Sequence, residues 1–191
     1  MKAFVIVNNY GPENAAKEPG WYFIADSAVT NTGKPFYLPE NLGEAAVSLA
    51  PAIRISRLGK YVAPKFAHRY WSEMAPAVHF YFPEYERKLL EGGLPADTAR
   101  NFDRSLFVGD FQPFEETTVI EFWKNGEKVS VFSFDSLHKN INDMISRISV
   151  MNTIKMGDLL LPGLAQPLTV EIGDRLDVKI GNKEAFTIKV K

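Results

Sequence analysis

The sequence predicts a strand-dominated α+β fold with a few helices. Short β-rich segments recur along the chain, and two pairs of them flank the turn dipeptides Asn125-Gly126 and Gly181-Asn182, which favour tight hairpins. Apolar residues at helical spacing, or a glycine pair that ends a charged segment, mark only three helices, at 64–74, 83–91 and 136–150. Strands therefore outnumber helices in the expected architecture.

Length and composition bound the possible functions. The 191 residues suit a single domain, expected to span 1–191, and 46% hydrophobic with 24% charged residues is typical of a globular protein. Lys plus Arg is 22 and Asp plus Glu is 23, so the formal charge of −1 disfavours nucleic acid as a partner. The chain has no cysteine, which excludes disulfides, thiolate nucleophiles and thiolate-bound metals.

The N-terminal segment predicts a strand and then loops. Residues 1–10 contain a short apolar run, which is too short for a signal peptide, and no segment approaches the ~20 apolar residues of a membrane span. We therefore expect no membrane association and a cytoplasmic location. Residues 11–44 are rich in Gly, Pro and Asn, which predicts loops with short extended pieces. Residues 1–45 are thus expected to form a strand and a lid-like loop region.

The remaining elements follow in order along the chain. A strand is expected at 52–57, where apolar and polar residues alternate before Gly59, and an apolar strand at 77–82. The first helix is expected at 64–74, and the charged helix at 83–91 ends at Gly92-Gly93. A hairpin spans 117–134, and the stripe Leu137, Ile141, Met144, Ile145 and Ile148 predicts a helix from about 136 to 150. A second hairpin around Gly181-Asn182 closes the chain.

Local motifs of catalysis are absent from the sequence. It contains three histidines but no HExxH, GxSxG or phosphate-binding glycine loop. His68 and His138 are interpreted as structural residues, because a lone histidine in a helix is seldom a ligand. His79 lies in an apolar strand on the face opposite Val78 and Phe80, where a satisfied or half-exposed histidine remains the simpler interpretation.

The carboxylates give no clear acid/base pair. Glu84, Glu86 and Glu91 are interpreted as the solvated face of the charged helix, because basic residues lie between them. Asp103 and Asp158 are interpreted as turn or cap residues.

A set of segments in a fixed order nevertheless resembles the fumarylacetoacetate hydrolase family, in particular its small single-domain members. These segments cover nearly the whole chain; they are Asn9-Tyr10 with Lys17-Glu18 and Gly20-Trp21, residues 33–40, residues 54–60, residues 66–70, Asn101-Phe102-Asp103 with Val108-Gly109, Asn125-Gly126-Glu127, and residues 145–149 leading to Met156-Gly157-Asp158. The resemblance implies a mixed β-roll or distorted barrel with peripheral helices, and a homodimer.

The family resemblance also implies where a metal would bind. Family enzymes hold Mg²⁺ or Mn²⁺ through a Glu-x-Glu pair and a later Asp, and they cleave, isomerise or decarboxylate β-dicarbonyl acids. The corresponding positions here are Ser48, Ala50 and His79, so all three acidic ligands are replaced. The family's lysine corresponds to Arg100, which could bind a ligand carboxylate through its planar fork, and the family's lid glutamate corresponds to Glu18.

Two hypotheses follow from these replacements. Serine, alanine and a neutral imidazole offer little charge to offset the dehydration of Mg²⁺, so we expect no bound metal cofactor and a catalytically silent homologue that acts as a binding or partner protein. Its ligand-binding positions would be Ser48, His79 and Arg100. The alternative is an active Mg²⁺- or Mn²⁺-dependent hydrolase, isomerase or decarboxylase of 2-oxo or β-diketo acids, with a rebuilt site that uses His79 with Glu84 or Glu44.

Overall fold

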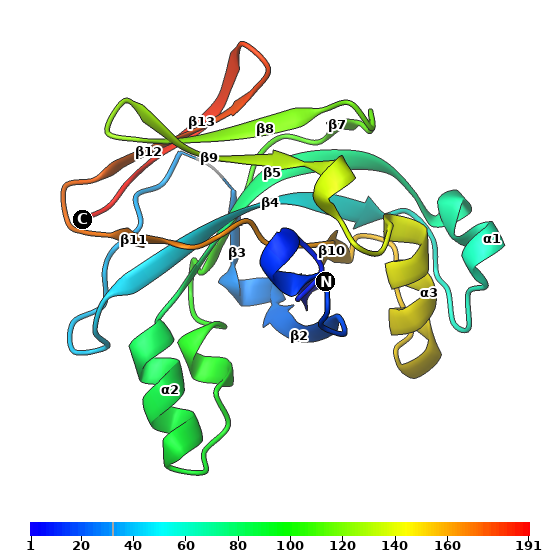
Figure 1. The fold of residues 1–191 in the computed structure, drawn as a ribbon, viewed down its shortest axis with the longest axis horizontal. Coiled ribbons are helices and arrows are strands. Elements are labelled where there is room, and N and C mark those ends of the chain that lie inside the picture. The colour runs from blue at the N-terminus through cyan, green and yellow to red at the C-terminus, as the bar shows by residue number, and fades with distance from the viewer. Residues whose placement is uncertain (32) are drawn as a thin grey trace.

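Two β-sheets form the framework of the protein in the computed structural model, which describes residues 1–31 and 33–191 (Figure 1). The larger sheet has nine strands: β1 (Lys2–Val7), β2 (Gly20–Ala25), β3 (Val29–Asn31), β4 (Ala45–Ile55), β5 (Trp71–Tyr81), β6 (Leu106–Val108), β7 (Gln112–Pro113), β10 (Leu159–Leu161) and β11 (Leu168–Val170). The smaller sheet has four: β8 (Val119–Lys124), β9 (Glu127–Ser133), β12 (Arg175–Ile180) and β13 (Lys183–Lys189).

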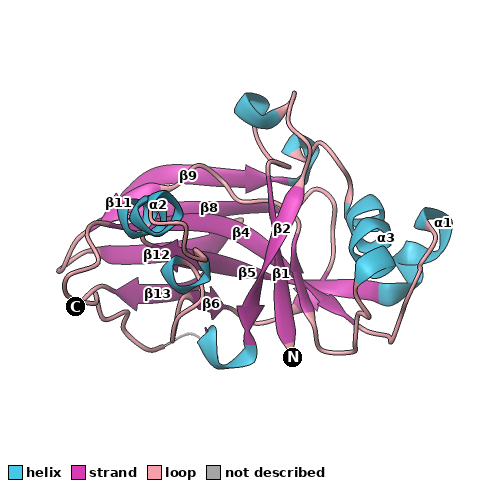
Figure 2. Cartoon of the chain, turned by 90° about the horizontal axis from the view of Figure 1, so that it is seen from below, coloured by secondary structure: helices cyan, strands magenta, loops and turns pink. Residues whose placement is uncertain are grey.

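The nine-stranded sheet is mixed and strongly curved. Its order is β2-β1-β10-β4-β5-β6-β3, with β11 also paired to β4 and β7 to β5; the β1–β10 and β3–β6 pairs are parallel. Figures 1 and 2 show the helix α2 (Pro83–Glu91) on the face of β4 and β5 opposite the four-stranded sheet, while α1 (Pro64–Ala67) and α3 (Ile141–Met151) lie beyond one end of the strands. This arrangement confirms the expected strand-dominated β-roll with peripheral helices.

The antiparallel pair β4–β5 divides the core into two parts. Alternate residues of β4 such as Val47 and Leu49 enter the main cluster, together with Phe122, Phe132 and other side chains of the smaller sheet. The opposite face of the pair carries small residues: Ala50, Ala52, Ala75 and Ala77 belong to a second, smaller buried cluster. Both faces of the pair are therefore covered.

Two prolines lie opposite each other at the middle of this pair. Pro51 of β4 pairs with Pro76 of β5. Neither proline has an N–H to donate across the pair. The backbone nitrogen of each therefore faces away from the opposite strand, where no hydrogen bond is needed. On the far side of β4, β10 pairs with residues 53–54 and β11 with residues 45–47, so Pro51 falls between them. Pro76 falls between β7 and β6 in the same way, and its carbonyl accepts a hydrogen bond from the Gly109 amide at 2.9 Å.

Four expected elements have different bounds in the structure. The strand expected at 77–82 is β5, Trp71–Tyr81, which begins six residues earlier. The strand expected at 52–57 is β4 at Ala45–Ile55, which begins seven residues earlier. The helix expected at 64–74 is wrong beyond its first turns: α1 ends at Ala67, a 3-10 turn covers His68–Tyr70, and Trp71 already begins β5. Pairing of β5 with β4 over ten residue pairs outweighs the helical spacing of its apolar side chains.

The third helix begins later than its apolar stripe suggests. Asn140 caps α3 by accepting a hydrogen bond from the Asp143 amide at 2.9 Å, so Leu137 lies outside the helix. Ile141, Met144, Ile145 and Ile148 are buried as the stripe predicts. The charged helix is confirmed as α2, Pro83–Glu91.

Both predicted hairpins are confirmed. Asn125 and Gly126 connect β8 to β9 with φ angles of 53° and 88°, the left-handed conformation that a two-residue turn of this kind requires. Residues 11–44 contain β2, β3 and 3-10 turns between loops, which agrees with the expected short extended pieces. Within the described ranges, no helix is long and apolar enough to cross a bilayer.

The first hairpin offers a test of its turn. We expect Gly126→Ala to lower the free energy of unfolding by about 1 kcal/mol, because a Cβ disfavours positive φ. A Cβ at Gly126 would meet no atom within 4 Å, so the cost is conformational rather than steric. Urea unfolding measures the change. Gly92→Ala is the matched control, because Gly92 has a φ of −79° and should cost little; an equal loss in both variants would contradict the interpretation.

Candidate functional site

The structure places Ser48 and His79 directly opposite each other on β4 and β5, and Ala50 two residues along β4 on the same face. All three are buried, and the His79 side chain has no exposed surface. The sheet register therefore brings the three positions together. The face that they share is the one covered by β2 and α2, opposite the main core.

His79 takes part in a closed ring of hydrogen bonds. Its Nε2–H donates to the Arg100 carbonyl at 2.9 Å, which leaves Nδ1 to accept from the Tyr22 hydroxyl at 3.2 Å. The Tyr22 oxygen in turn accepts from Nη1 of Arg100 at 3.3 Å. Arg100 thus holds His79 through its backbone on one side and through Tyr22 on the other, and both imidazole nitrogens are occupied.

Glu86 occupies the planar fork of Arg100. The Glu86 carboxylate accepts from Nε at 2.6 Å and from Nη2 at 2.7 Å, a bidentate geometry. The two side chains keep only 22% and 19% of their surface exposed. The guanidinium also lies over the rings of Tyr22 and Tyr81, at 4.9 Å and 4.8 Å from their centroids. We call Tyr22, His79, Tyr81, Glu86 and Arg100 the histidine cluster.

Burial sets the protonation states of the histidine cluster. Burial, together with the positive charge of Arg100, lowers the pKa of His79 to about 4, although its hydrogen bond to the Arg100 carbonyl opposes the shift. Burial also raises the pKa of Tyr22 to about 12, and Arg100 offsets part of that rise. At neutral pH the imidazole is neutral and the phenol protonated. His79 is a poor general base, because an imidazole with a pKa near 4 is weakly basic and its Nδ1 already accepts a hydrogen bond from Tyr22.

The donor set around Ser48 does not fit a divalent cation. Within residues 1–31 and 33–191, no group of three His, Cys, Asp or Glu side chains is arranged to hold a metal. Both nitrogens of His79 are already hydrogen-bonded, and the Glu86 carboxylate is bound to Arg100. The positively charged guanidinium of Arg100 would also repel a metal cation beside His79. Mg²⁺ and Mn²⁺ require hard oxygen ligands, and serine is the only oxygen-bearing side chain among the three family positions.

Glu18 is not part of the histidine cluster. It lies on the surface after the first 3-10 turn and forms an ion pair with Arg147 of α3 at 3.2 Å, with 84% of its side chain exposed. Glu44 and Glu84 are also exposed. Neither belongs to the hydrogen-bonded ring around His79.

The other histidines and acids have local structural surroundings. His138 donates from Nε2 to the Gly11 carbonyl at 2.7 Å, and His68 is exposed in a 3-10 turn. Asp158 accepts from the Lys155 amide and pairs with Lys2 at 3.0 Å, in a turn before β10. Asp103 lies in an exposed turn.

One interpretation of the acids is corrected. Glu84 and Glu91 are on the exposed side of α2, with ion pairs to Lys88 and Arg87, but Glu86 is not part of that solvated face. The turn of the helix points Glu86 at Arg100 instead.

Tyr22, Tyr81 and Glu86 are the members of the histidine cluster that sequence reasoning missed. Tyr81 could have been found, because it is two residues beyond His79 on the same face of β5. Tyr22 and Glu86 come from β2 and α2, far from His79 in sequence, and no local pattern indicates their contact. A cavity of about 240 Å³ adjoins the cluster, lined by Val7, Tyr22, Phe23, Glu86, Ala96, Asp97 and Arg100.

Comparison with known proteins places this fold. No family model and no curated protein matches the chain by sequence. Among solved structures, it is similar to a fumarylacetoacetate hydrolase family protein from Yersinia pestis CO92, with a TM-score of 0.90 and 21% identity over 100% of this chain and 92% of that one.

Two further solved structures share this architecture. A fumarylpyruvate hydrolase from Pseudomonas aeruginosa, solved with Mn²⁺ and pyruvate, has a TM-score of 0.89 and 19% identity over 100% of this chain and 89% of that one. A 5-carboxymethyl-2-hydroxymuconate delta-isomerase from Mycobacterium smegmatis has a TM-score of 0.88 and 20% identity, over 99% and 76%. The chain therefore has the fold of the fumarylacetoacetate hydrolase family, as the resemblance implies.

Proposed function

We propose, from the fold that it shares with fumarylacetoacetate hydrolase family proteins, that this chain is a homologue that has lost metal-dependent catalysis and acts as a non-catalytic binding or partner protein. Proteins of this fold include hydrolases and isomerases, and one is a Mn²⁺ complex. Fold alone does not establish activity, because function depends on the site.

The chemistry at the three metal-ligand positions carries the proposal. Ser48, Ala50 and His79 meet on one face of the sheet as the family ligands would, but they provide no carboxylate. Both nitrogens of His79 are used within the protein, and a cation there would face the guanidinium of Arg100. Loss of a single residue that hydrogen-bonds to a metal ligand typically reduces metal affinity about 10 to 100-fold. Loss of all the acidic ligands themselves should therefore abolish metal binding.

The histidine cluster also bears on small-molecule binding. Arg100 could hold a ligand carboxylate only by releasing Glu86, which occupies the same donors. The arrangement therefore favours a partner protein over a receptor for small carboxylic acids. We propose a homodimer or a pairing with an active relative as its assembly.

Metal binding and turnover test the loss of catalysis. We expect no saturable Mn²⁺ binding by electron paramagnetic resonance, and no Mg²⁺- or Mn²⁺-dependent turnover of oxaloacetate, acylpyruvates or fumarylpyruvate. The fumarylpyruvate hydrolase from Pseudomonas aeruginosa serves as the positive control, since its structure contains Mn²⁺. Stoichiometric Mn²⁺ together with turnover would overturn the proposal in favour of a rebuilt site.

Variants identify such a site if it exists. An enzyme that used His79 with Glu44 or Glu84 would lose activity in His79→Gln and in the corresponding glutamine variant. Glu91→Gln is the control, because Glu91 is exposed on α2 beside Arg87. Light scattering after size exclusion, alone and mixed with an active relative, distinguishes a homodimer from a mixed assembly.

A further inference from the structure

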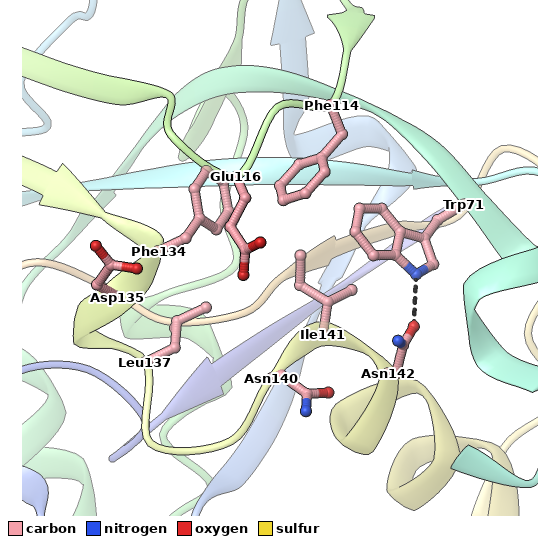
Figure 3. A pocket seen from close by; sticks show the side chains of 9 residues that line it. All are labelled: Trp71, Phe114, Glu116, Phe134, Asp135, Leu137, Asn140, Ile141 and Asn142. Carbon is pink, nitrogen blue, oxygen red and sulfur yellow. Dashed lines mark hydrogen bonds between the residues drawn. The ribbon is translucent and has the colours of Figure 1, made fainter. Parts of the chain in front are cut away.

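A second pocket lies away from the histidine cluster and shares no residue with it (Figure 3). It has a volume of about 470 Å³ and is formed by the start of β5, the loop that follows β7, the 3-10 turn at Phe134–Ser136 and the start of α3. Its lining residues are Trp71, Phe114, Glu116, Phe134, Asp135, Leu137, Asn140, Ile141 and Asn142. We call it the aromatic pocket.

Three aromatic rings form an ordered wall of the aromatic pocket. Phe114 packs edge-on against Trp71, with ring centroids 4.7 Å apart, and against Phe134 at 5.0 Å. The Trp71 indole is fixed further, because its Nε1–H donates to Oδ1 of Asn142 at 2.9 Å. Ring faces attract organic cations, and a ring held in place loses little freedom when it binds one.

Two carboxylates give the aromatic pocket a negative charge. Neither Glu116 nor Asp135 forms an ion pair or a hydrogen bond with another residue of the described chain, and no Lys or Arg lines the pocket. In Figure 3 the Glu116 carboxylate points into the space bounded by Phe134, Leu137 and Ile141. A positive ligand would meet no competing cation there.

The side-chain oxygens of the two asparagines in the pocket each already accept a hydrogen bond. Oδ1 of Asn140 accepts from the Asp143 amide at the start of α3, and Oδ1 of Asn142 accepts from Trp71. The open side-chain acceptors are therefore the two carboxylates. Two carboxylates among apolar groups do not provide the oxygen set that Mg²⁺ or Ca²⁺ requires, and an anion would be repelled.

We propose that the aromatic pocket binds an organic ammonium ion that carries a short apolar stem. The rings and the Leu137 and Ile141 side chains cover the stem, and the carboxylates of Glu116 and Asp135 neutralise the charge. A free alkylamine and a lysine side chain both have this chemistry. This inference is independent of whether the histidine cluster supports catalysis.

Nuclear magnetic resonance of the intact chain tests the proposal with n-butylammonium chloride as the probe. The chain has three tryptophans, so the indole N–H region contains three peaks, and Trp71→Phe identifies the one from Trp71. We expect a saturable shift of the Trp71 peak, while the peaks of Trp21 and Trp123 stay in place. Butanol and sodium butyrate at equal concentration separate the effect of charge from that of the apolar stem.

Charge removal provides the decisive comparison. The double variant Glu116→Gln/Asp135→Asn should weaken n-butylammonium binding about tenfold, since each exposed carboxylate contributes about threefold and the two factors multiply. Glu115→Gln is the matched control, because Glu115 is exposed beside Glu116 but does not line the pocket. The backbone amide spectrum verifies that each variant stays folded.

The outcomes divide clearly. Unchanged affinity in the double variant, an equal shift with butanol, or the absence of a saturable shift would each overturn the proposal. Nα-acetyl-lysine N-methylamide, which keeps the side-chain ammonium of lysine, then identifies the source of the ammonium group. If it binds as n-butylammonium does, the pocket takes a lysine side chain; if only n-butylammonium binds, the pocket takes a small amine.

Discussion

Arg100→Met should lower the free energy of unfolding by about 2 to 3 kcal/mol, because it leaves the Glu86 carboxylate partly buried without its partner. The substitution also removes the donor to Tyr22, and so weakens the ring of hydrogen bonds around His79. Some exposed surface remains on both side chains, which keeps the cost at or below the roughly 3 to 5 kcal/mol typical of a fully buried ion pair. Urea denaturation at pH 7 measures it.

The same helix supplies the control. Glu91 forms an ion pair with Arg87 at 2.7 Å, but both side chains are more than half exposed. Glu91→Gln should therefore cost less than about 0.5 kcal/mol. A double-mutant cycle of Arg100→Met with Glu86→Gln isolates the pair itself. Equal losses for the Glu91 and Arg100 variants would mean that the histidine cluster contributes no special stability.

Acid should destabilise the protein through His79. The folded state holds the pKa of this residue near 4, against 6.5 for an ordinary histidine, so the unfolded chain binds the proton more readily. Stability contributed by neutral His79 is present above about pH 6.5 and is lost as pH falls toward 4. Between pH 7 and pH 5 the loss should be about 2 kcal/mol, as the two pKa values imply.

Substitution separates His79 from the other titrating groups. His79→Gln should remove most of the pH dependence between 7 and 5, although it lowers stability at pH 7. His138→Gln should retain the dependence, because His138 lies elsewhere, hydrogen-bonded to Gly11. If His79→Gln kept the full slope of unfolding free energy against pH, the buried neutral imidazole would not be its source.

The fold was predictable where local chemistry decides it. Asn125-Gly126 places a hairpin wherever strands flank it, and the glycines after α2 end a short helix. The bounds of β4 were not predictable, because Val47 and Ser48 are both buried on opposite faces and the alternation of apolar and polar residues disappears. Trp71 suits a helix by spacing, and only its pairing with β4 makes it part of a strand.

The histidine cluster was predictable only in part. The resemblance selected Ser48, His79 and Arg100, and the sheet and loop geometry does bring these positions near one another. The ion pair of Arg100 with Glu86 could not be predicted, because Glu86 lies on a helix whose charged residues suggest a solvated face. Hydrogen bonds between residues 22, 79 and 100 depend on the assembled fold, and no spacing in the sequence records them.

The facing prolines of β4 and β5 have a consequence for how the chain avoids misfolding. If either strand slipped by one residue, a proline would stand where its neighbour requires an amide donor, and a carbonyl would lose its bond. A slip of β4 would also carry Leu49 out of the main core, and a slip of β5 would carry Val78 out. Pro51 and Pro76 therefore disfavour the wrong alignment of the two longest strands, β4 and β5.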